Sequence, residues 1–176
     1  MKRQLVVILA IIAAVSGCTK KEPTRTSGID TIDNTTYYGT TYYTYGFLFS
    51  SAKLVKTFPS PGPDIALYVN IDNVTPRLTL QSNNLSPSFS KVGDYPDAAS
   101  AQSAFDNLKL VSATQWTDMA DPILDNQVWT YKSGTGNYAK IRIISTVNEM
   151  RSSLAYGECT FQWVYQAGGS TTFTGK

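Results

Sequence analysis

The sequence predicts a mostly β fold, an antiparallel sandwich or barrel-like sheet with one packed α-helix at about residues 97–110. Short runs rich in Thr, Tyr, Val, Ile and Phe recur along the chain, and these residue types favour strands. Turn residues separate the runs, most clearly in the Pro- and Gly-rich segment 59–63. Only one segment, 97–110, has apolar residues at helical spacing. Many strands and one helix indicate a sheet-based domain with a helix on one side.

The N-terminus has the pattern of a secretory leader. Lys2 and Arg3 precede an apolar run, residues 5–15, that is too short for a membrane-spanning helix. The run ends in VSGC, which resembles a bacterial lipobox, with small residues before the cysteine that accepts lipid. We therefore expect residues 1–17 to be a signal peptide and Cys18 to carry the lipid anchor. This predicts a membrane partner for the chain and a place in the outer membrane or at the cell surface.

Residues 18–34 are polar, contain Pro and Gly and have few aromatics, so they predict a flexible tether. A single all-β domain is then expected over residues 35–176. The formal net charge is +2, and removal of Lys2 and Arg3 brings it to zero. A neutral mature chain lacks the basic surface that nucleic-acid binding needs, so no nucleic-acid partner is expected.

Strands are expected in order along this domain. The Tyr- and Thr-rich segment 35–49 predicts two short strands, with Gly39 and Gly46 at breaks or bends. Segments 83–97, 112–127 and 148–157 read as loops or irregular structure. The remaining strands are expected at 54–58, 65–71, 77–81, 128–132, 138–146, 158–166 and 171–174.

The predicted helix has both a start signal and an apolar face. Asp97, after Pro96, can cap its N-terminus. The stripe that packs on the sheet is formed by Ala101, Ala104, Phe105 and Leu108.

Cysteine and histidine usage limits the chemistry. With Cys18 lipidated, Cys159 has no partner for an internal disulfide, and alternation places it on one strand face with Phe161, Trp163 and Tyr165. A buried thiol is the simplest interpretation. The chain has no His, which excludes Ser-His-Asp and Cys-His catalysis, HExxH zinc sites and imidazole haem ligation. The acidic residues are scattered, so no enzymatic activity is expected.

The C-terminal third carries a family resemblance. Residues 129–131 read WTY, residues 136–145 read GNYAKIRIIS, and residues 159–166 read CTFQWVYQ. Together these motifs resemble the HmuY-type haem-binding lipoproteins of Bacteroidota. Upstream, residues 63–67 read PDIAL, similar to a family WDIAF motif with Pro63 in place of Trp. The resemblance covers about residues 43–173 and is clearest in the last forty or so.

This resemblance implies a surface-held β protein that captures haem for iron acquisition and passes it to an outer-membrane receptor. Family members hold the iron with two His or two Met. Here His is absent, and two Met remain once Met1 is removed with the leader, Met119 and Met150, both in segments expected as loops. A thioether is a competent ligand for haem iron, so these two Met are the candidate pair. Filling gaps in the core is the alternative role for them.

Aromatic and basic side chains give further candidates. Tyr37, Tyr38, Tyr42, Tyr43 and Tyr45 form a cluster that either packs across strands or offers a stacking platform, to which Trp116 could contribute. A Tyr can also ligate ferric haem. Lys140 and Arg142 share one strand face, expected to be solvated, where they could alternatively pair with haem propionates or an acidic partner.

Two functions remain ahead of any enzyme. The first is haem capture by a cell-envelope lipoprotein. The alternative is a surface binding or adhesion module for a glycan or protein partner, in the same β fold and without haem. The first requires an apolar pocket near Met119, Met150 or a Tyr, and the second requires exposed aromatics on one face.

Overall fold

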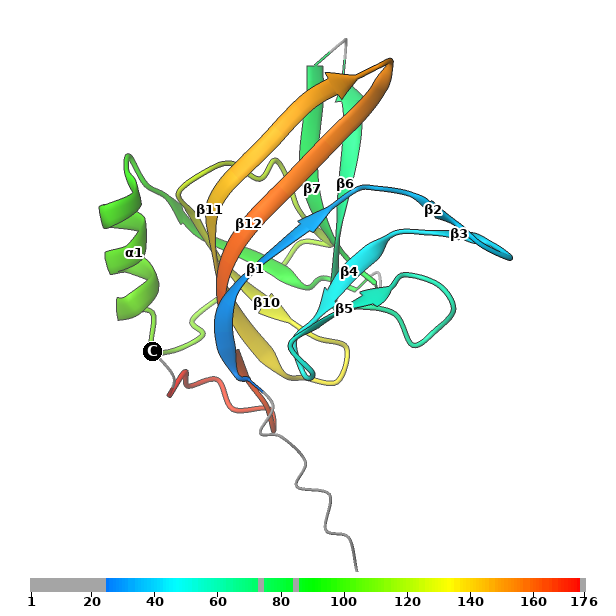
Figure 1. Ribbon diagram of the computed structural model, residues 1–176. Coiled ribbons are helices and arrows are strands. Elements are labelled where there is room, and N and C mark those ends of the chain that lie inside the picture. Colours follow the sequence, from blue (N-terminus) through cyan, green and yellow to red (C-terminus); the bar gives the residue numbers. More distant parts are fainter. Residues whose placement is uncertain (1–24, 73–74, 84–85, 175–176) are drawn as a thin grey trace, which may run out of the picture.

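Two five-stranded antiparallel sheets pack face to face in the computed structural model, which describes residues 25–72, 75–83 and 86–174 (Figure 1). The first sheet has the order β1-β12-β11-β10-β8. Its strands are β1 (Ser27–Asp33), β8 (Phe89–Asp94), β10 (Gln127–Lys132), β11 (Tyr138–Arg151) and β12 (Leu154–Gln166). The predicted mostly β architecture with one packed helix is confirmed.

The second sheet has the order β5-β4-β6-β7-β9. Its strands are β4 (Tyr45–Leu48), β5 (Lys53–Lys56), β6 (Ile65–Asp72), β7 (Thr75–Ser82) and β9 (Met119–Ala120). A separate two-stranded ribbon, β2 (Tyr37–Tyr38) paired with β3 (Tyr42–Tyr43), projects from the side of the sandwich (Figure 1). We call residues 34–44, which include this ribbon, the tyrosine arm.

The predicted tether is wrong in its last part, because residues 27–33 form strand β1. This strand pairs with β12 along its whole length, from Ser27 opposite Val164 to Asp33 opposite Glu158. Ile32 is buried in the core, and Asp30 accepts a hydrogen bond of 2.7 Å from the Trp163 indole. The strand was not predicted because it lies at the edge of the sheet. Its outer side faces solvent and needs few apolar residues, so its sequence is polar. The signal peptide and Cys18 lie outside the described residues.

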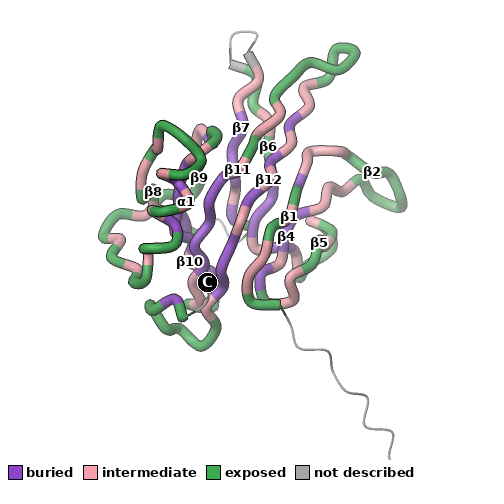
Figure 2. Tube along the Cα trace, turned by 60° about the vertical axis from the view of Figure 1, so that its left-hand side comes forward, coloured by how far each residue is buried: buried purple, intermediate pink, exposed green. Residues whose placement is uncertain are grey.

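The core between the sheets is built from interlocked rings. Phe47 of β4 lies 5.5 Å from Phe161 and 5.2 Å from Trp163 of β12, measured between ring centroids. Phe49 stacks on Tyr165 of β12 at 6.1 Å. Cys159 is fully buried on the same face of β12, which confirms the predicted alternation. Figure 2 shows that burial is concentrated in the middle of these strands and that the hairpin tips are exposed.

Helix α1 (Ala98–Asn107) covers the outer face of the first sheet. Asp97 is its N-cap as predicted and accepts a hydrogen bond of 2.7 Å from the Ser100 amide. Phe105 is buried against a second apolar cluster with Val128, Val164 and Phe173, so the apolar stripe packs on the sheet as expected.

The expectation that Lys140 and Arg142 lie on a solvated face is wrong, because the helix covers them. Lys140 is fully buried and its ammonium donates to the carbonyl oxygens of Phe105 (2.8 Å) and Leu108 (3.2 Å). These carbonyls are at the C-terminal end of the helix, where a positive charge is favoured. Burial lowers the pKa of Lys140. Arg142 is also buried and donates to the Gln162 side chain at 3.0 Å.

Three segments differ from the expected pattern. Residues 148–157, predicted as a loop, continue β11 and β12 into a long hairpin that turns at Ser152 and Ser153, both with positive φ. Strand β8 lies inside the predicted loop 83–97 and pairs with β10. The last predicted strand, 171–174, contributes only an isolated bridge between Thr172 and Leu110. Strands that are polar and exposed on both faces lack the alternation of apolar and polar residues from which a strand is predicted.

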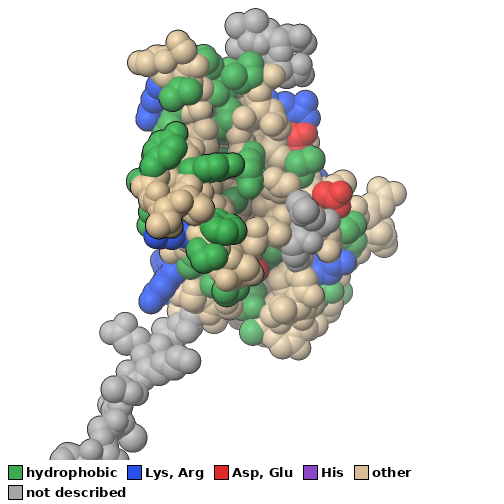
Figure 3. Space-filling model, turned by 90° about the vertical axis from the view of Figure 1, so that its right-hand side faces the viewer, with side chains coloured by type: hydrophobic (Ala, Val, Ile, Leu, Met, Phe, Trp, Pro, Cys, Tyr) green, Lys and Arg blue, Asp and Glu red, His purple; other side chains and the backbone are tan. Residues whose placement is uncertain are grey.

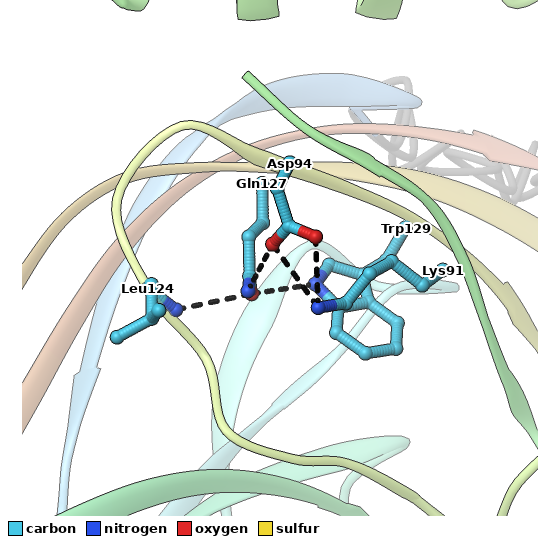
Figure 4. Close-up of polar contacts among 5 residues, drawn as sticks. All are labelled: Lys91, Asp94, Leu124, Gln127 and Trp129. Atoms are coloured by element: carbon cyan, nitrogen blue, oxygen red, sulfur yellow. Dashed lines mark hydrogen bonds and ion pairs between the residues drawn. The ribbon is translucent and has the colours of Figure 1, made fainter. Parts of the chain in front are cut away.

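A polar network joins β8 to β10 and links the buried Gln127 and Trp129 to the exposed Lys91 and Asp94 (Figure 4). The Gln127 side chain accepts from the Trp129 indole (3.0 Å) and the Leu124 amide (3.0 Å), and donates to Asp94 at 2.8 Å. The Lys91 ammonium lies 3.0 Å from the Asp94 carboxylate and over the Trp129 ring. Each buried polar group in this network is therefore satisfied.

Among the described residues, no helix has the length and apolar character needed to span a membrane.

We predict that Gly157→Ala destabilises the fold by about 1–3 kcal/mol, the usual range for overpacking a core. A Cβ at Gly157 on β12 would clash with the Leu78 and Val69 side chains of the facing sheet. Gly39→Ala is the matched control, since its Cβ would make only ordinary contacts at 3.7 Å and beyond. Urea unfolding measures both. Equal effects of the two substitutions would contradict the close approach of the sheets.

We predict that Asp94→Asn lowers stability more at pH 7 than at pH 3. The hydrogen bond from Lys91, followed by that from Gln127, lowers the pKa of Asp94. A carboxylate with a depressed folded pKa stabilises the fold fully above its unfolded value near 3.9, and this contribution is lost as pH falls through the folded value. Urea midpoints at the two pH values test this, with the exposed Asp118→Asn as control. A difference between wild type and Asp94→Asn that does not change with pH would contradict it.

Candidate ligand-binding cleft

The tyrosine arm is held to the sandwich by stacked rings. Tyr37 stacks on Tyr43 across the ribbon, with centroids 5.8 Å apart. Both rings meet Tyr45 of β4 edge-on, at 5.4 and 5.6 Å. Because each such pair adds about 0.5–1.5 kcal/mol beyond its buried area, three rings can order a short ribbon. Cross-strand packing, one of the two roles predicted for the Tyr cluster, is confirmed for Tyr37, Tyr43 and Tyr45.

The other two tyrosines of the cluster are exposed. Tyr38 and Tyr42 are register partners on the two strands of the arm, so they are cross-strand neighbours. Their exposed fractions are 86% and 75%. Large aromatic side chains left in solvent at this level are available to a ligand or partner.

A cleft of about 620 Å³ lies between the arm and strand β6. This volume is in the range of sites for small molecules and cofactors. Figure 3 shows this side of the molecule, where hydrophobic side chains gather on the surface. The described residues that line the cleft are Asn34, Thr36, Thr41, Tyr42, Tyr43, Thr44, Thr57, Phe58, Leu67, Tyr68, Val69 and Asn83.

Aromatic side chains dominate the apolar part of this lining. Tyr42 comes from the arm, Phe58 follows β5, and Tyr68 lies on β6. Phe58 and Tyr68 are 54% and 44% exposed, so together with Tyr42 they offer ring surface from three separate segments. Such an arrangement can hold a flat ligand by stacking and apolar contact.

The polar part of the lining is neutral. Four Thr and two Asn residues line the cleft, and none of the lining residues that the structure describes carries a formal charge. Thr44 and Thr57 are already paired through their hydroxyls at 3.3 Å, which ties the base of the arm to the end of β5. The cleft therefore supplies hydrogen-bond donors and acceptors without a charge of its own.

The structure does not bring the two candidate Met residues together. Met119 pairs with Gln81 at one end of β7, while Asn148, two residues before Met150, donates to the Pro76 carbonyl near the other end. Gln81 and Pro76 are five positions apart on β7, or about 17 Å at the rise of a strand. Both Met side chains are exposed and neither lines the cleft. They do not form an axial pair on one iron.

Two other predicted stacking residues also lie away from the cleft lining. Trp116 packs against Tyr138 at 6.3 Å and lies under the Lys132 ammonium. Tyr45 supports Tyr37 and Tyr43 from the base of the arm. Of the predicted stacking residues, Tyr42 and Tyr43 line the cleft.

Sequence reasoning missed Phe58 and Tyr68. Tyr68 had a usable signal, because alternation along β6 places it on the opposite face from the buried Leu67. An aromatic residue on the solvent side of a strand is a candidate for binding. Phe58 had no comparable signal, since its position depends on how the chain leaves β5.

Among the described residues, no group of three His, Cys, Asp or Glu side chains could hold a metal ion. Burial strongly raises the pKa of the Cys159 thiol, which therefore stays protonated at neutral pH. Asp64 is partly buried, and this burial raises its pKa against the opposing hydrogen bonds from the Phe49 amide and the Tyr131 hydroxyl. These contacts make it a structural group.

We predict that Tyr43→Ala loosens the arm without unfolding the sandwich. The substitution removes the ring contacts to Tyr37 and Tyr45, while the interlocked core rings are untouched. Amide hydrogen exchange in residues 37–45 should accelerate about tenfold, consistent with the loss of two aromatic pairs. Tyr38→Ala is the control, because Tyr38 is largely exposed. Unchanged exchange in the arm of Tyr43→Ala would show that the rings do not order it.

Comparison with known proteins assigns no family to the chain. No protein-family model, no curated protein and no solved structure matches it significantly. The resemblance to HmuY-type lipoproteins thus depends on the motifs of the C-terminal third.

Proposed function

We propose that this protein is a non-enzymatic, lipid-anchored binding protein of the cell envelope that captures a flat, largely apolar ligand in the cleft beside the tyrosine arm. The observation that carries the proposal is the exposure of Tyr42, Phe58 and Tyr68 around one concave site of about 620 Å³. Exposed rings in a concave site are costly to leave in water and are well suited to stacking on a planar molecule.

Haem is the ligand proposed for this cleft. It is flat and mostly apolar, and the resemblance to HmuY-type lipoproteins implies it. Proteins ligate haem iron through His, Met, Cys or Tyr. The described lining of the cleft has no His, Met or Cys, so the phenol oxygens of Tyr42, Tyr43 and Tyr68 are the candidate iron ligands there. Tyr42 is the first choice as iron ligand because it is the most exposed of the three. Transfer to an outer-membrane receptor would follow capture.

A neutral glycan is the second candidate. The observation that favours it is the ring of Thr hydroxyls and Asn amides around exposed aromatics, with no charged side chain among the described lining residues. Sugar rings bind by stacking their apolar faces on aromatics while their hydroxyl groups form hydrogen bonds. This candidate predicts binding of a neutral oligosaccharide and no affinity for haem.

We predict that haemin titration of the purified chain produces a saturable Soret shift. Tyr42→Ala should weaken binding at least tenfold, because it removes both a stacking surface and the proposed iron ligand. Tyr42→Phe should keep most of the stacking and change the ferric spectrum. Double substitution of Met119 and Met150 by Ala should leave the titration unchanged, since neither Met lines the cleft.

Tyr38→Ala is the matched control, an exposed arm tyrosine that is absent from the described lining. Loss of the Soret shift in the double Met variant would instead identify the two Met residues as the iron ligands. No saturable shift in the ferric or ferrous state would refute haem binding and leave the glycan candidate, to be tested by oligosaccharide binding to wild type and Tyr42→Ala.

A further inference from the structure

The Lys56 ammonium lies beside the cleft, whose described lining carries no formal charge. The Lys56 ammonium is 4.2 Å from the ring centroid of Tyr43, which lines the cleft. Lys56 ends β5, and the next two residues, Thr57 and Phe58, are themselves part of the lining. The ammonium therefore lies at the rim of the cleft, against one of its lining rings.

This ammonium has no carboxylate partner in the part of the chain that the structure describes. The four ion pairs found there involve other side chains, and Lys56 itself is exposed. Its contact with the Tyr43 face is a weak one at an exposed site, so the flexible side chain can leave the ring for a stronger partner. A charge-assisted hydrogen bond to a carboxylate is stronger than such a contact.

The other lysine of the same strand has a different environment. Lys53 pairs with Leu48 at the far end of β5, whereas Lys56 pairs with Tyr45. Because side chains alternate along a strand, positions 53 and 56 point to opposite faces. Lys53 is exposed, and it is Lys56, on the opposite face of the strand, whose ammonium lies over a ring that lines the cleft, so Lys53 provides a lysine of equal charge for comparison.

We propose that Lys56 determines specificity by binding an anionic substituent, a carboxylate, on the edge of the flat ligand that occupies the cleft. The inference depends on the proposed function and adds the charge of the ligand to it. The planar part stacks on Tyr42, Phe58 and Tyr68, and the carboxylate reaches the rim and pairs with the Lys56 ammonium. An uncharged cleft wall with a cation at its edge favours a planar apolar ligand that carries a carboxylate on one edge.

The test compares protoporphyrin IX, which has two carboxylates, with its dimethyl ester, which has the same ring and none. Fluorescence titrations of the full chain use the two probes in one buffer and co-solvent, without iron, so that metal ligation plays no part. Wild type should bind the diacid about tenfold more tightly than the diester, as one charge-assisted hydrogen bond allows. Lys56→Met should bind both probes equally, while Lys56→Arg should keep most of the preference.

Lys53→Met is the matched control and should retain the wild-type preference. The diester measures any damage to the cleft, because its binding should be the same in wild type and Lys56→Met. Equal binding of diacid and diester by wild type, or a preference that survives Lys56→Met, would overturn the role of Lys56 and leave the proposed function standing. Binding of neither probe would overturn the role of Lys56 and stacking as the mode of binding, whereas the haemin titration above tests the proposed function with iron present.

Discussion

The structure depends on the interlocking of β12 and β4 across the sandwich. Phe161 and Trp163 of β12 meet Phe47 of β4, and Tyr165 stacks on Phe49 just beyond it. Rings of this size remove a large apolar surface from water, and their close contact geometry permits few relative positions of the sheets. Gly157, further along β12, lets the sheets approach where a Cβ would clash. The registration of the two sheets follows from these contacts.

The position of β4 in turn places the binding surface. Tyr45 begins β4, two residues before the buried Phe47, and supports the stacked pair Tyr37 and Tyr43 of the arm. The core therefore determines where the arm leaves the sandwich, and the arm forms one wall of the cleft. The opposite wall is β6, which hydrogen-bonds to β4 and carries Tyr68 on the solvent side. Binding residues on an arm and a loop, held by a rigid sandwich, are a common arrangement in binding proteins.

The sequence predicted the parts of the fold that alternation or capping specifies. The buried face of β12, the N-cap Asp97 and the apolar stripe of α1 all follow from short-range patterns. Strands β1 and β8 at the edges of the first sheet, and the outer half of the β11–β12 hairpin, could not be predicted, since strands with exposed faces lack apolar alternation. The burial of Lys140 was not predicted for a different reason. A local sequence pattern cannot show that a helix distant in the chain will cover this side chain and supply two carbonyl oxygens as hydrogen-bond acceptors. The same limit applies to the cleft, whose walls come from four separate segments.

Because stability and the proposed binding use different residues, the ligand can change while the fold is retained. The rings that hold the sheets together are buried between them, whereas Tyr42, Phe58 and Tyr68 are exposed and contribute little to that core. Substitutions at the arm can then alter what is bound at small cost to folding, in the same way that one scaffold carries many functions in other proteins. The absence of His fits this view. A chain that resembles haem-binding lipoproteins but lacks their His ligands need not have lost binding. In the proposed function a planar ligand is held by aromatic contact, and the Lys56 ammonium at the rim selects among ligands by charge.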